Sequence, residues 1–377
     1  MAVLQGKYGH FSDDGKSYVI SDWKTPKPWA NVISNGRWGL TIAQTGSGYS
    51  WLDHAMLNRI TRWDQDLISD ASGKYLFLRD ENTGKFWSLT PMPLKPEFDE
   101  FSCTHGLGYT DFKGLYAKIR SSLRIFVPRG LNCEMWVLKI RNEGNTSRKL
   151  SSFTYFNPVL DVFPDWHREF HKTFVTSEYD EQHHALLFGK TLWTAPLKHD
   201  GSWNKDWPYR MFFMSDLPPA DFECNRERFL GQYNTITEAA ALSGAPLTGT
   251  TGTGFEQCAT LHHEMELAPG QEITLVYCLG AEEKTNDASM LERYSRAVSD
   301  HERLFRESCA FWTEFCDRLT VDTPDPAVNV LANFWLKYQA YSCRIMGRSA
   351  YYQCGGAYGF RDQLQDSLLF LSLEPDK

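Results

Sequence analysis

A short stretch near residue 360 holds the side chains whose types could do chemistry. Arg361, Asp362 and Asp366 follow a loop rich in tyrosine and glycine at residues 351–360. On a helix, Asp362 and Asp366 lie one turn apart and share a face, with Cβ atoms about 5–6 Å apart. Two carboxylates can cleave a glycosidic bond, one protonating the leaving oxygen while the other activates water. The spacing equally fits a structural role, in which Asp362 caps the helix and Asp366 pairs with Arg361 or is exposed.

Cationic and flexible residues around this pair indicate a polar ligand. The guanidinium of Arg361 next to the Asp362 carboxylate offers donors and acceptors together, as the vicinal hydroxyls of a sugar require. The glycines at 355, 356 and 359 would let the backbone approach a ligand, or would serve a tight turn. Arg348 follows a glycine at an expected helix end, where a cation is favourable for structural reasons and could also bind phosphate.

Other polar clusters have weaker functional patterns. The adjacent histidines at 183–184 and 262–263 would face opposite sides of a strand, so we expect no metal site there. No glycine-rich segment is followed by the Gly-Lys-Ser/Thr of a phosphate-binding loop. The run Asp165–Glu169 has catalytic residue types, but one sequence does not show that they converge.

Helices are expected from about residue 286 onwards. Apolar residues over 290–315 recur at three- and four-residue intervals, which predicts one long amphipathic helix or two. After a break at Thr323–Pro324, Asp325 can cap a new helix and Pro326 fits its first position. This second helix should run to about residue 346, and a third should begin at residue 362 and end before residue 375. Three helices cannot bury one another, so we expect them to open an α-helical domain that extends beyond this chain.

Short β-rich runs separated by turn residues precede these helices. The runs 74–78 and 85–89 flank Asn82–Gly84 and predict a hairpin. Further strands are expected at 123–127, 134–140, 152–156 and 272–277. Even spacing over more than 250 residues favours a large antiparallel β-sandwich. The predicted organisation is a β-sandwich over 1–284, a helical linker over 285–323 and the start of a helical domain over 324–377.

Composition excludes several functional classes. The 377 residues carry a net charge of −8 with no Lys/Arg run, so nucleic acid is not an expected partner. The first residues lack the apolar region of a signal peptide, and no uninterrupted apolar run reaches about 18 residues, which predicts a cytoplasmic protein without a membrane partner. Nine cysteines, with no C-x-x-C pair, fit free thiols. Aromatic residues reach 14%, enough to fill cores and also to form platforms for sugar rings.

Family-like motifs run through the whole chain, and they are Tyr8–Phe11, Pro28–Asn31, Gly46–Trp51, Arg59–Trp63, His105–Tyr109 and, most specifically, Gly359–Asp366. Together they resemble glycoside hydrolase family 94, which contains cellobiose, cellobionic acid, cellodextrin, laminaribiose and chitobiose phosphorylases. The resemblance implies an N-terminal β-sandwich, a helical linker, an (α/α)6 barrel and a C-terminal jelly roll. This chain would supply the first two parts and the first helices of the barrel.

The resemblance also implies a reaction, the inverting phosphorolysis of a β-linked disaccharide to an α-sugar 1-phosphate and a released sugar. Phosphate is the co-substrate and nucleophile, so no cofactor and no carboxylate base are needed, and one protein acid suffices. In the family this acid is an aspartate in an Asp-Trp-Asn-Asp context, so the catalytic acid is expected downstream of Lys377. Cellobiose and cellobionic acid are the favoured substrates, laminaribiose and chitobiose are further candidates, and family dimers imply a homodimer.

Site residues follow from the same resemblance. Arg361 and Asp366 match positions that hold the sugar hydroxyls of the donor subsite, Asp362 supports them, and Arg348 resembles an arginine close to the phosphate.

A second set lies in the N-terminal part. Arg59, Arg62 and Trp63 match a loop that reaches towards the partner's acceptor side in family dimers, although a surface arginine pair beside a packed tryptophan is a structural alternative. Two other functions stay open: a non-catalytic carbohydrate-binding or assembly module, and an inverting hydrolase that would need a second carboxylate base.

Overall fold

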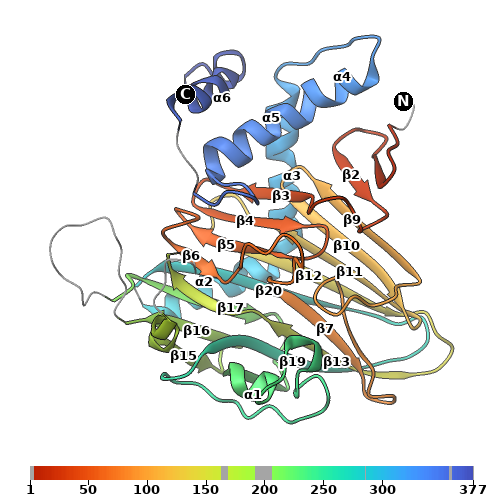
Figure 1. Ribbon diagram of the computed structural model, residues 1–377, viewed down its shortest axis with the longest axis vertical. Helices are drawn as coiled ribbons and strands as arrows, with labels where there is room; N and C mark the ends of the chain where they lie inside the picture. Colours follow the sequence, from red (N-terminus) through yellow and green to blue (C-terminus); the bar gives the residue numbers. More distant parts are fainter. Residues whose placement is uncertain (1–3, 163–168, 192–205, 285, 356–358, 377) are drawn as a thin grey trace.

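The computed structural model describes residues 4–162, 169–191, 206–284, 286–355 and 359–376. Within them the strands form one ten-stranded and two five-stranded sheets, all with antiparallel neighbours (Figure 1). The ten-stranded sheet has the order β1 (Gly9–Phe11), β2 (Ser17–Ile20), β9 (Glu100–Gly106), β10 (Tyr109–Tyr116), β11 (Ile119–Phe126), β12 (Cys133–Asn142), β20 (Glu272–Glu283), β17 (Tyr209–Ser215), β16 (Ala185–Lys190) and β15 (Val175–Asp180).

The two smaller sheets complete the sandwich. One has the order β18 (Asp221–Asn225), β19 (Gln257–Leu267), β13 (Arg148–Tyr155), β7 (Tyr75–Asp80) and β8 (Phe86–Ser88). The other has the order β14 (Pro158–Asp161), β6 (Arg59–Thr61), β5 (Gly48–Leu52), β4 (Trp38–Ala43) and β3 (Ala30–Ser34). The predicted sandwich and the β7–β8 hairpin are therefore confirmed.

Side-chain alternation along β12 shows why the large sheet is covered on both faces. Trp136 and Leu138 point into the core shared with the smaller sheets, where they join Trp38 of β4. Met135, on the opposite face, joins the cluster formed with Met290 and Leu291 of the helix that follows β20. Successive strand residues face opposite ways, so one apolar strand serves two cores.

A buried ion pair lies where the sheets meet. The Glu134 carboxylate of β12 pairs with Lys74, and it accepts hydrogen bonds from the indole nitrogens of Trp38 at 3.1 Å and Trp136 at 2.7 Å. The Ser50 hydroxyl of β5 also donates to this carboxylate. A charge buried this deeply is tolerated because it has an opposite charge and hydrogen-bond donors around it. The network therefore links the three sheets at the point where they meet.

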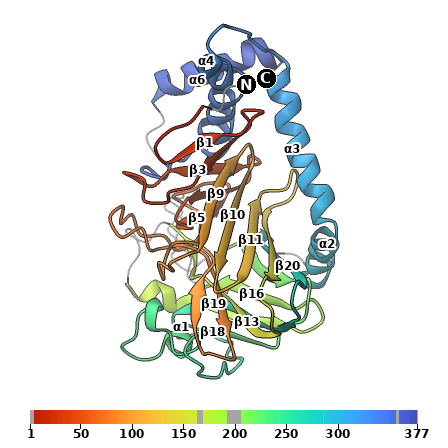
Figure 2. The same ribbon diagram turned by 90° about the vertical axis from the view of Figure 1, so that its right-hand side faces the viewer.

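Helices cover the outer face of the large sheet and then rise above the sandwich (Figure 2). These are α2 (Asp287–Ser299), α3 (His301–Asp317), α4 (Pro326–Val330), η4 (Leu331–Trp335), α5 (Leu336–Tyr338), η5 (Gln339–Gly347) and α6 (Phe360–Leu373). Three short helices occur between strands of the sandwich along the chain, and they are η2 (Glu169–Phe174), α1 (Arg226–Leu230) and η3 (Ile236–Glu238).

Local chemistry explains the helix ends. The 290–315 run forms two helices, because α2 ends at Ser299 and α3 begins at His301. The Asp325 carboxylate accepts a hydrogen bond from Ala327 N at 2.8 Å, and Pro326 opens α4, as predicted. From α4 to η5 the chain is one continuous helical stretch, Pro326 to Gly347, with two π-helical segments.

The helices are held on the sandwich by a second aromatic core. Trp312 and Phe315 of α3 pack with Tyr338 and Tyr341 of the α5–η5 stretch and with Leu107 of the β9–β10 turn. The next residue in that turn must be glycine, because Gly108 has φ +85° and a Cβ there would lie 2.5 Å from the Trp312 indole nitrogen. The sandwich thus fixes where the residues before α6 lie.

Candidate active site

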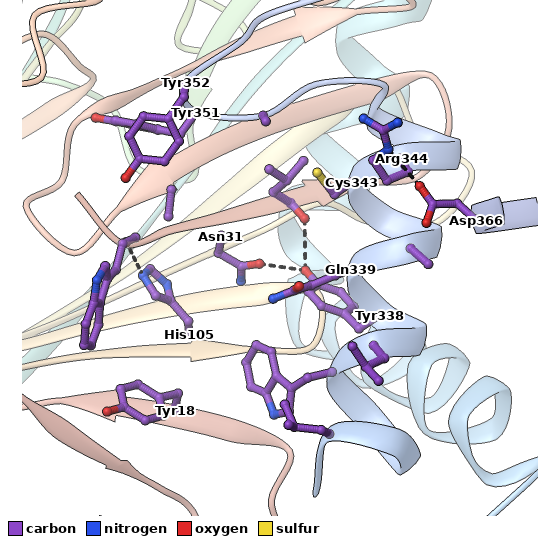
Figure 3. Close-up of a pocket in the computed structure, with 18 of the residues that line it drawn as sticks. Tyr18, Asn31, His105, Tyr338, Gln339, Cys343, Arg344, Tyr351, Tyr352 and Asp366 are labelled. Atoms are coloured by element: carbon purple, nitrogen blue, oxygen red, sulfur yellow. Dashed lines mark hydrogen bonds and ion pairs between the residues drawn. The ribbon is translucent and has the colours of Figure 1, made fainter. Parts of the chain in front are cut away.

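A cavity of about 610 Å³ lies between the first strands of the sandwich and the α4–η5 stretch (Figure 3). Aromatic rings and a few polar side chains line it; the rings include Tyr18, Trp29, Trp335, Tyr351 and Tyr352, and the polar groups include Asn31, His105, Gln339, Arg344 and Asp366. Flat rings with a few convergent polar groups are typical of sugar-binding pockets.

Polar groups on the strand side of the cavity are already satisfied within the fold. Asn31 donates to the carbonyl oxygens of Gly106 at 3.0 Å and Tyr109 at 2.9 Å, and its own oxygen accepts from the Tyr338 hydroxyl at 2.9 Å. His105 lies 2.9 Å from both the Trp29 carbonyl oxygen and the Thr110 hydroxyl. Burial lowers the pKa of His105 to about 4, so the ring is neutral at physiological pH. These groups shape the cavity and are poor candidates for proton transfer.

An ion pair between two helices lies at the edge of the cavity. Nε of Arg344, from η5, donates to Oδ2 of Asp366, from α6, at 2.8 Å. Both side chains are only partly buried, so both remain accessible to a ligand. The alternative in which Asp366 pairs with Arg361 is therefore wrong. The helical pattern alone could not identify Arg344, because it resembles an ordinary cation in the last turn of a helix.

Arg361 and Asp362 lie at the start of α6, outside the cavity lining. The Arg361 side chain is 83% exposed, and one of its terminal nitrogens lies 3.5 Å from Asp362 Oδ1. The helix begins at Phe360, so Asp362 lies inside its first turn and is not the capping residue. A carboxylate in this turn still interacts favourably with the helix dipole.

Arg348 ends the η5 helix in a left-handed conformation, with φ 47°. Such a φ is uncommon for a residue with a side chain. Its guanidinium is exposed and its charge reaches His54, whose pKa is lowered by burial and by that charge. Arg348 thus lies beside the loop before α6, near the sandwich but outside the cavity lining.

Tyrosine hydroxyls attach this loop to the sandwich. The Tyr351 hydroxyl donates to the buried carboxylate of Asp70, and its oxygen lies 2.8 Å from Ser47 Oγ. Tyr49, from β5, lies 3.0 Å from the hydroxyl of Ser349. Burial raises the pKa of Asp70 and, with the Asp70 charge, the pKa of Tyr351, so Tyr351 keeps its proton and acts as a donor. No sequence motif indicated a role for Asp70.

Close approach explains one of the loop glycines. Gly355 has φ +58°, and a Cβ there would lie 2.4 Å from the Cβ of Met56. Gly356 and residues 165–168 lie outside the described residues.

Arg59 and Trp63 are internal residues of the sandwich. Arg59 is 1% exposed, donates from Nε to the Ala55 carbonyl oxygen at 2.9 Å, and stacks its guanidinium 3.7 Å from the centre of the Tyr49 ring. Trp63 donates from its indole nitrogen to Ser47 at 3.1 Å. Only Arg62 is accessible, so the acceptor-side loop stays a prediction that depends on Arg62.

Two further features of the described residues concern metal ions and membranes. No group of three or more His, Cys, Asp and Glu side chains in this part of the chain is placed to hold a metal ion. Among the described helices, none has the length and apolar character needed to cross a membrane.

Comparison with known families identifies the chain. The model of the glycosyl hydrolase 94 supersandwich domain matches residues 16–297, and that of the glycosyl hydrolase 94 superfamily catalytic domain matches residues 311–377. The chain therefore belongs to the glycosyl hydrolase 94 family.

Three relatives show the range of proteins that this chain resembles. It is 35% identical over 98% of its length to the cyclic β-(1,2)-glucan synthase NdvB of Rhizobium meliloti, covering 13% of that protein. It is 28% identical to the N,N'-diacetylchitobiose phosphorylase of Vibrio proteolyticus over 98% of its length, and 27% identical to the solabiose phosphorylase of Paenibacillus borealis over 96%. The chain spans 45% of each phosphorylase.

Proposed function

We propose that this chain is the N-terminal part of an inverting disaccharide phosphorylase, a glycosyl-transferring enzyme. Phosphate would attack the anomeric carbon of a β-linked gluco-disaccharide, giving an α-sugar 1-phosphate and the released sugar. Cellobiose and cellobionic acid are the favoured substrates, with laminaribiose and chitobiose as further candidates. The observation that carries the proposal is the aromatic-walled cavity edged by Asp366 and Arg344, in a family whose relatives include named disaccharide phosphorylases.

The helical part is proposed to continue as an (α/α)6 barrel. Its exposed apolar side chains support this, since α6 exposes Phe360, Leu364, Leu368 and Leu371, and the preceding helices expose Val328, Leu331 and Leu336. Apolar faces of this size are normally covered by further structure. The domains would be a sandwich over 1–284, a linker over 285–323 and the start of the barrel from 324, with the catalytic acid beyond Lys377. A cytoplasmic homodimer without a cofactor completes the proposal.

Four residues are proposed to bind the substrates. Asp366 and Arg361 would hold the hydroxyls of the donor sugar, with Asp362 assisting, because guanidinium and carboxylate groups together match a polyol. Within the described part of the chain, Oδ1 of Asp366 accepts no hydrogen bond, and the Arg361 side chain is exposed. Arg348 would attract the phosphate, since an exposed guanidinium is a suitable partner for that anion.

A second candidate substrate class comes from the 35% identity to a cyclic β-(1,2)-glucan synthase. A donor site that holds one terminal glucosyl unit would accept a β-1,2-linked chain with the same residues. The linkage would then be selected on the acceptor side, where Arg62 is the candidate within this chain.

Product analysis of the protein at its full natural length tests the reaction. The substrates are cellobiose, cellobionic acid, laminaribiose, chitobiose and the β-1,2-linked disaccharide sophorose, each with and without phosphate. We expect an α-sugar 1-phosphate from at least one of them, only when phosphate is present. Free sugar as the sole product under both conditions would show that the enzyme is a hydrolase and not a phosphorylase. No turnover of any substrate would leave the carbohydrate-binding alternative.

The Arg361→Ala variant tests the donor site. Removal of a charged donor in contact with the reacting sugar should lower turnover about 100-fold or more. Arg306→Ala is the matched control, because Arg306 is an exposed helical arginine on α3. Similar turnover for both variants would remove Arg361 from the site.

A further inference from the structure

A second cavity, of about 320 Å³, lies on the sandwich. The chain segment after β6, the start of β7, the end of β13 and the start of α1 form its walls, with Arg62, Gly73, Tyr75, Tyr155 and Arg226 among the lining residues. It shares no lining residue with the first cavity. Figures 1 and 2 show α1, which begins at Arg226, and α6 at opposite ends of the molecule.

Two neighbouring tyrosines line this cavity, and only one of their hydroxyls is hydrogen-bonded within the described structure. Tyr75 and Tyr155 are cross-strand partners on β7 and β13, so their rings share a face of the sheet. The Tyr155 hydroxyl accepts from Arg226 Nε at 3.2 Å and donates to Asn157 at 3.4 Å. The Tyr75 side chain is as deeply buried, at 3% exposure, yet its hydroxyl has no hydrogen-bond partner in the described structure.

An unpaired buried hydroxyl is unfavourable, and Tyr75 lines this cavity, so a polar atom bound next to it there would satisfy the hydroxyl. The phenol end of this ring lies over Gly73, whose Cβ, if present, would be 3.0 Å from Tyr75 Cζ. A larger residue at Gly73 would therefore crowd this end of the Tyr75 ring.

Charges around the cavity alternate and cancel. Arg62 lies 3.2 Å from Asp64 and 3.3 Å from Glu256, and Arg226 lies 3.1 Å from Glu256. Lys172 approaches the outer side of this row, 3.2 Å from Glu256. A phosphate or carboxylate would meet two acidic groups here. Vicinal hydroxyls both donate and accept, and they match a row of alternating guanidinium and carboxylate groups.

We infer that this second cavity is a carbohydrate site that holds one or two hexose units of a neutral gluco-oligosaccharide. The volume is at the low end of small-molecule sites, which begin at about 300 Å³. Tyr75, Tyr155 and Ile236 form the apolar part of the lining, while Arg62, Arg226 and the Tyr75 hydroxyl supply hydrogen bonds. Binding here needs no phosphate and would retain a longer glucan on the enzyme, with Arg62 shared between this cavity and the proposed acceptor side.

Calorimetric titration with cellotriose in phosphate-free buffer tests the inference. The protein at full natural length carries Arg361→Ala in every sample, so that the proposed donor site contributes little. In this background we expect saturable binding that Arg226→Gln weakens about 10-fold and Tyr75→Phe about 3- to 10-fold, as for the loss of a charged and a neutral hydrogen bond. Arg228→Gln is the control, because Arg228 lies on the same helix, bonds Thr248 and does not line the cavity.

Thermal unfolding without sugar separates binding from structure. Tyr75→Phe removes a hydroxyl that has no partner, so the melting temperature should be unchanged or higher. The inference is overturned if cellotriose does not bind in the Arg361→Ala background, or if Tyr75→Phe and Arg226→Gln bind as tightly as Arg228→Gln. Tighter binding of glucuronate or inorganic phosphate than of cellotriose would replace the neutral sugar with an anion.

Discussion

Tyr351 attaches the loop before α6 to the sandwich, and the Tyr351→Phe variant removes that attachment without changing the ring. The hydroxyl donates to the Asp70 carboxylate and lies 2.8 Å from Ser47 Oγ, and both tyrosine and aspartate are buried. The ring itself packs against Trp63, with 4.9 Å between ring centres, and this contact is retained in phenylalanine. The substitution therefore isolates the polar contacts of one hydroxyl.

The expected loss of unfolding free energy follows from the contacts of this hydroxyl with Asp70 and Ser47. A hydrogen bond to a charged group contributes about 1.5–3 kcal/mol and one to a neutral group about 0.5–1.5 kcal/mol. Asp70 keeps its bond from the Thr45 hydroxyl at 2.5 Å, so the carboxylate is not left bare. We expect Tyr351→Phe to lower the free energy of unfolding by about 2–4 kcal/mol.

The neighbouring tyrosine is a matched control. Tyr352 donates to the Pro28 carbonyl oxygen at 2.6 Å but is 45% exposed, so water can replace its partner. Tyr352→Phe should cost about 0.5–1 kcal/mol in urea denaturation followed by tryptophan fluorescence. A double-mutant cycle of Tyr351→Phe with Asp70→Asn should give a coupling energy of about 1–2 kcal/mol. Equal costs for the two tyrosines, or no coupling, would refute the attachment.

Two further predictions concern buried titratable groups. Burial lowers the pKa of His105 to about 4 from its ordinary 6.5, so the unfolded chain binds the proton first as the pH falls. The free energy of unfolding should therefore decrease between about pH 6.5 and pH 4, by up to ~3 kcal/mol. His105→Gln should flatten this part of a stability–pH profile, and an unchanged slope would contradict the prediction. Lys190 and Asp161 form a fully buried ion pair at 2.5 Å. Lys190→Met should lower the free energy of unfolding in urea by about 3–5 kcal/mol, and adding Asp161→Asn should recover part of the loss. A loss below about 1 kcal/mol would contradict the importance of this ion pair.

Local patterns predicted the elements better than their pairing. The 134–140 run lies within β12, and the 123–127 run overlaps β11, its antiparallel neighbour. The 152–156 run overlaps β13, but this strand pairs with β7 and β19 in another sheet. Turn residues between consecutive strands do not specify such a change of sheet, because it depends on which distant face remains unpaired.

The candidate site shows the same limit at the level of side chains. Asp366 was predicted from its helical spacing and its motif, whereas its partner Arg344 lies 22 residues away on another helix. Their contact depends on how η5 and α6 cross, which no local pattern contains. Arg59 shows the reverse case, since a cation predicted for a loop is buried in a strand, stacked on the Tyr49 ring.

The sandwich also acts on the site through the loop that it holds. Ser47, Tyr49 and Asp70 bind Ser349 and Tyr351, and Arg348 and α6 flank this loop. Arg348, Arg361 and Asp362 therefore lie at helix ends next to a loop that the sandwich holds. The substitution Tyr351→Phe keeps the ring at the cavity wall and removes only the hydroxyl that holds the loop. It should reduce turnover as well as stability, because a displacement of about 1 Å is costly for oriented reactants.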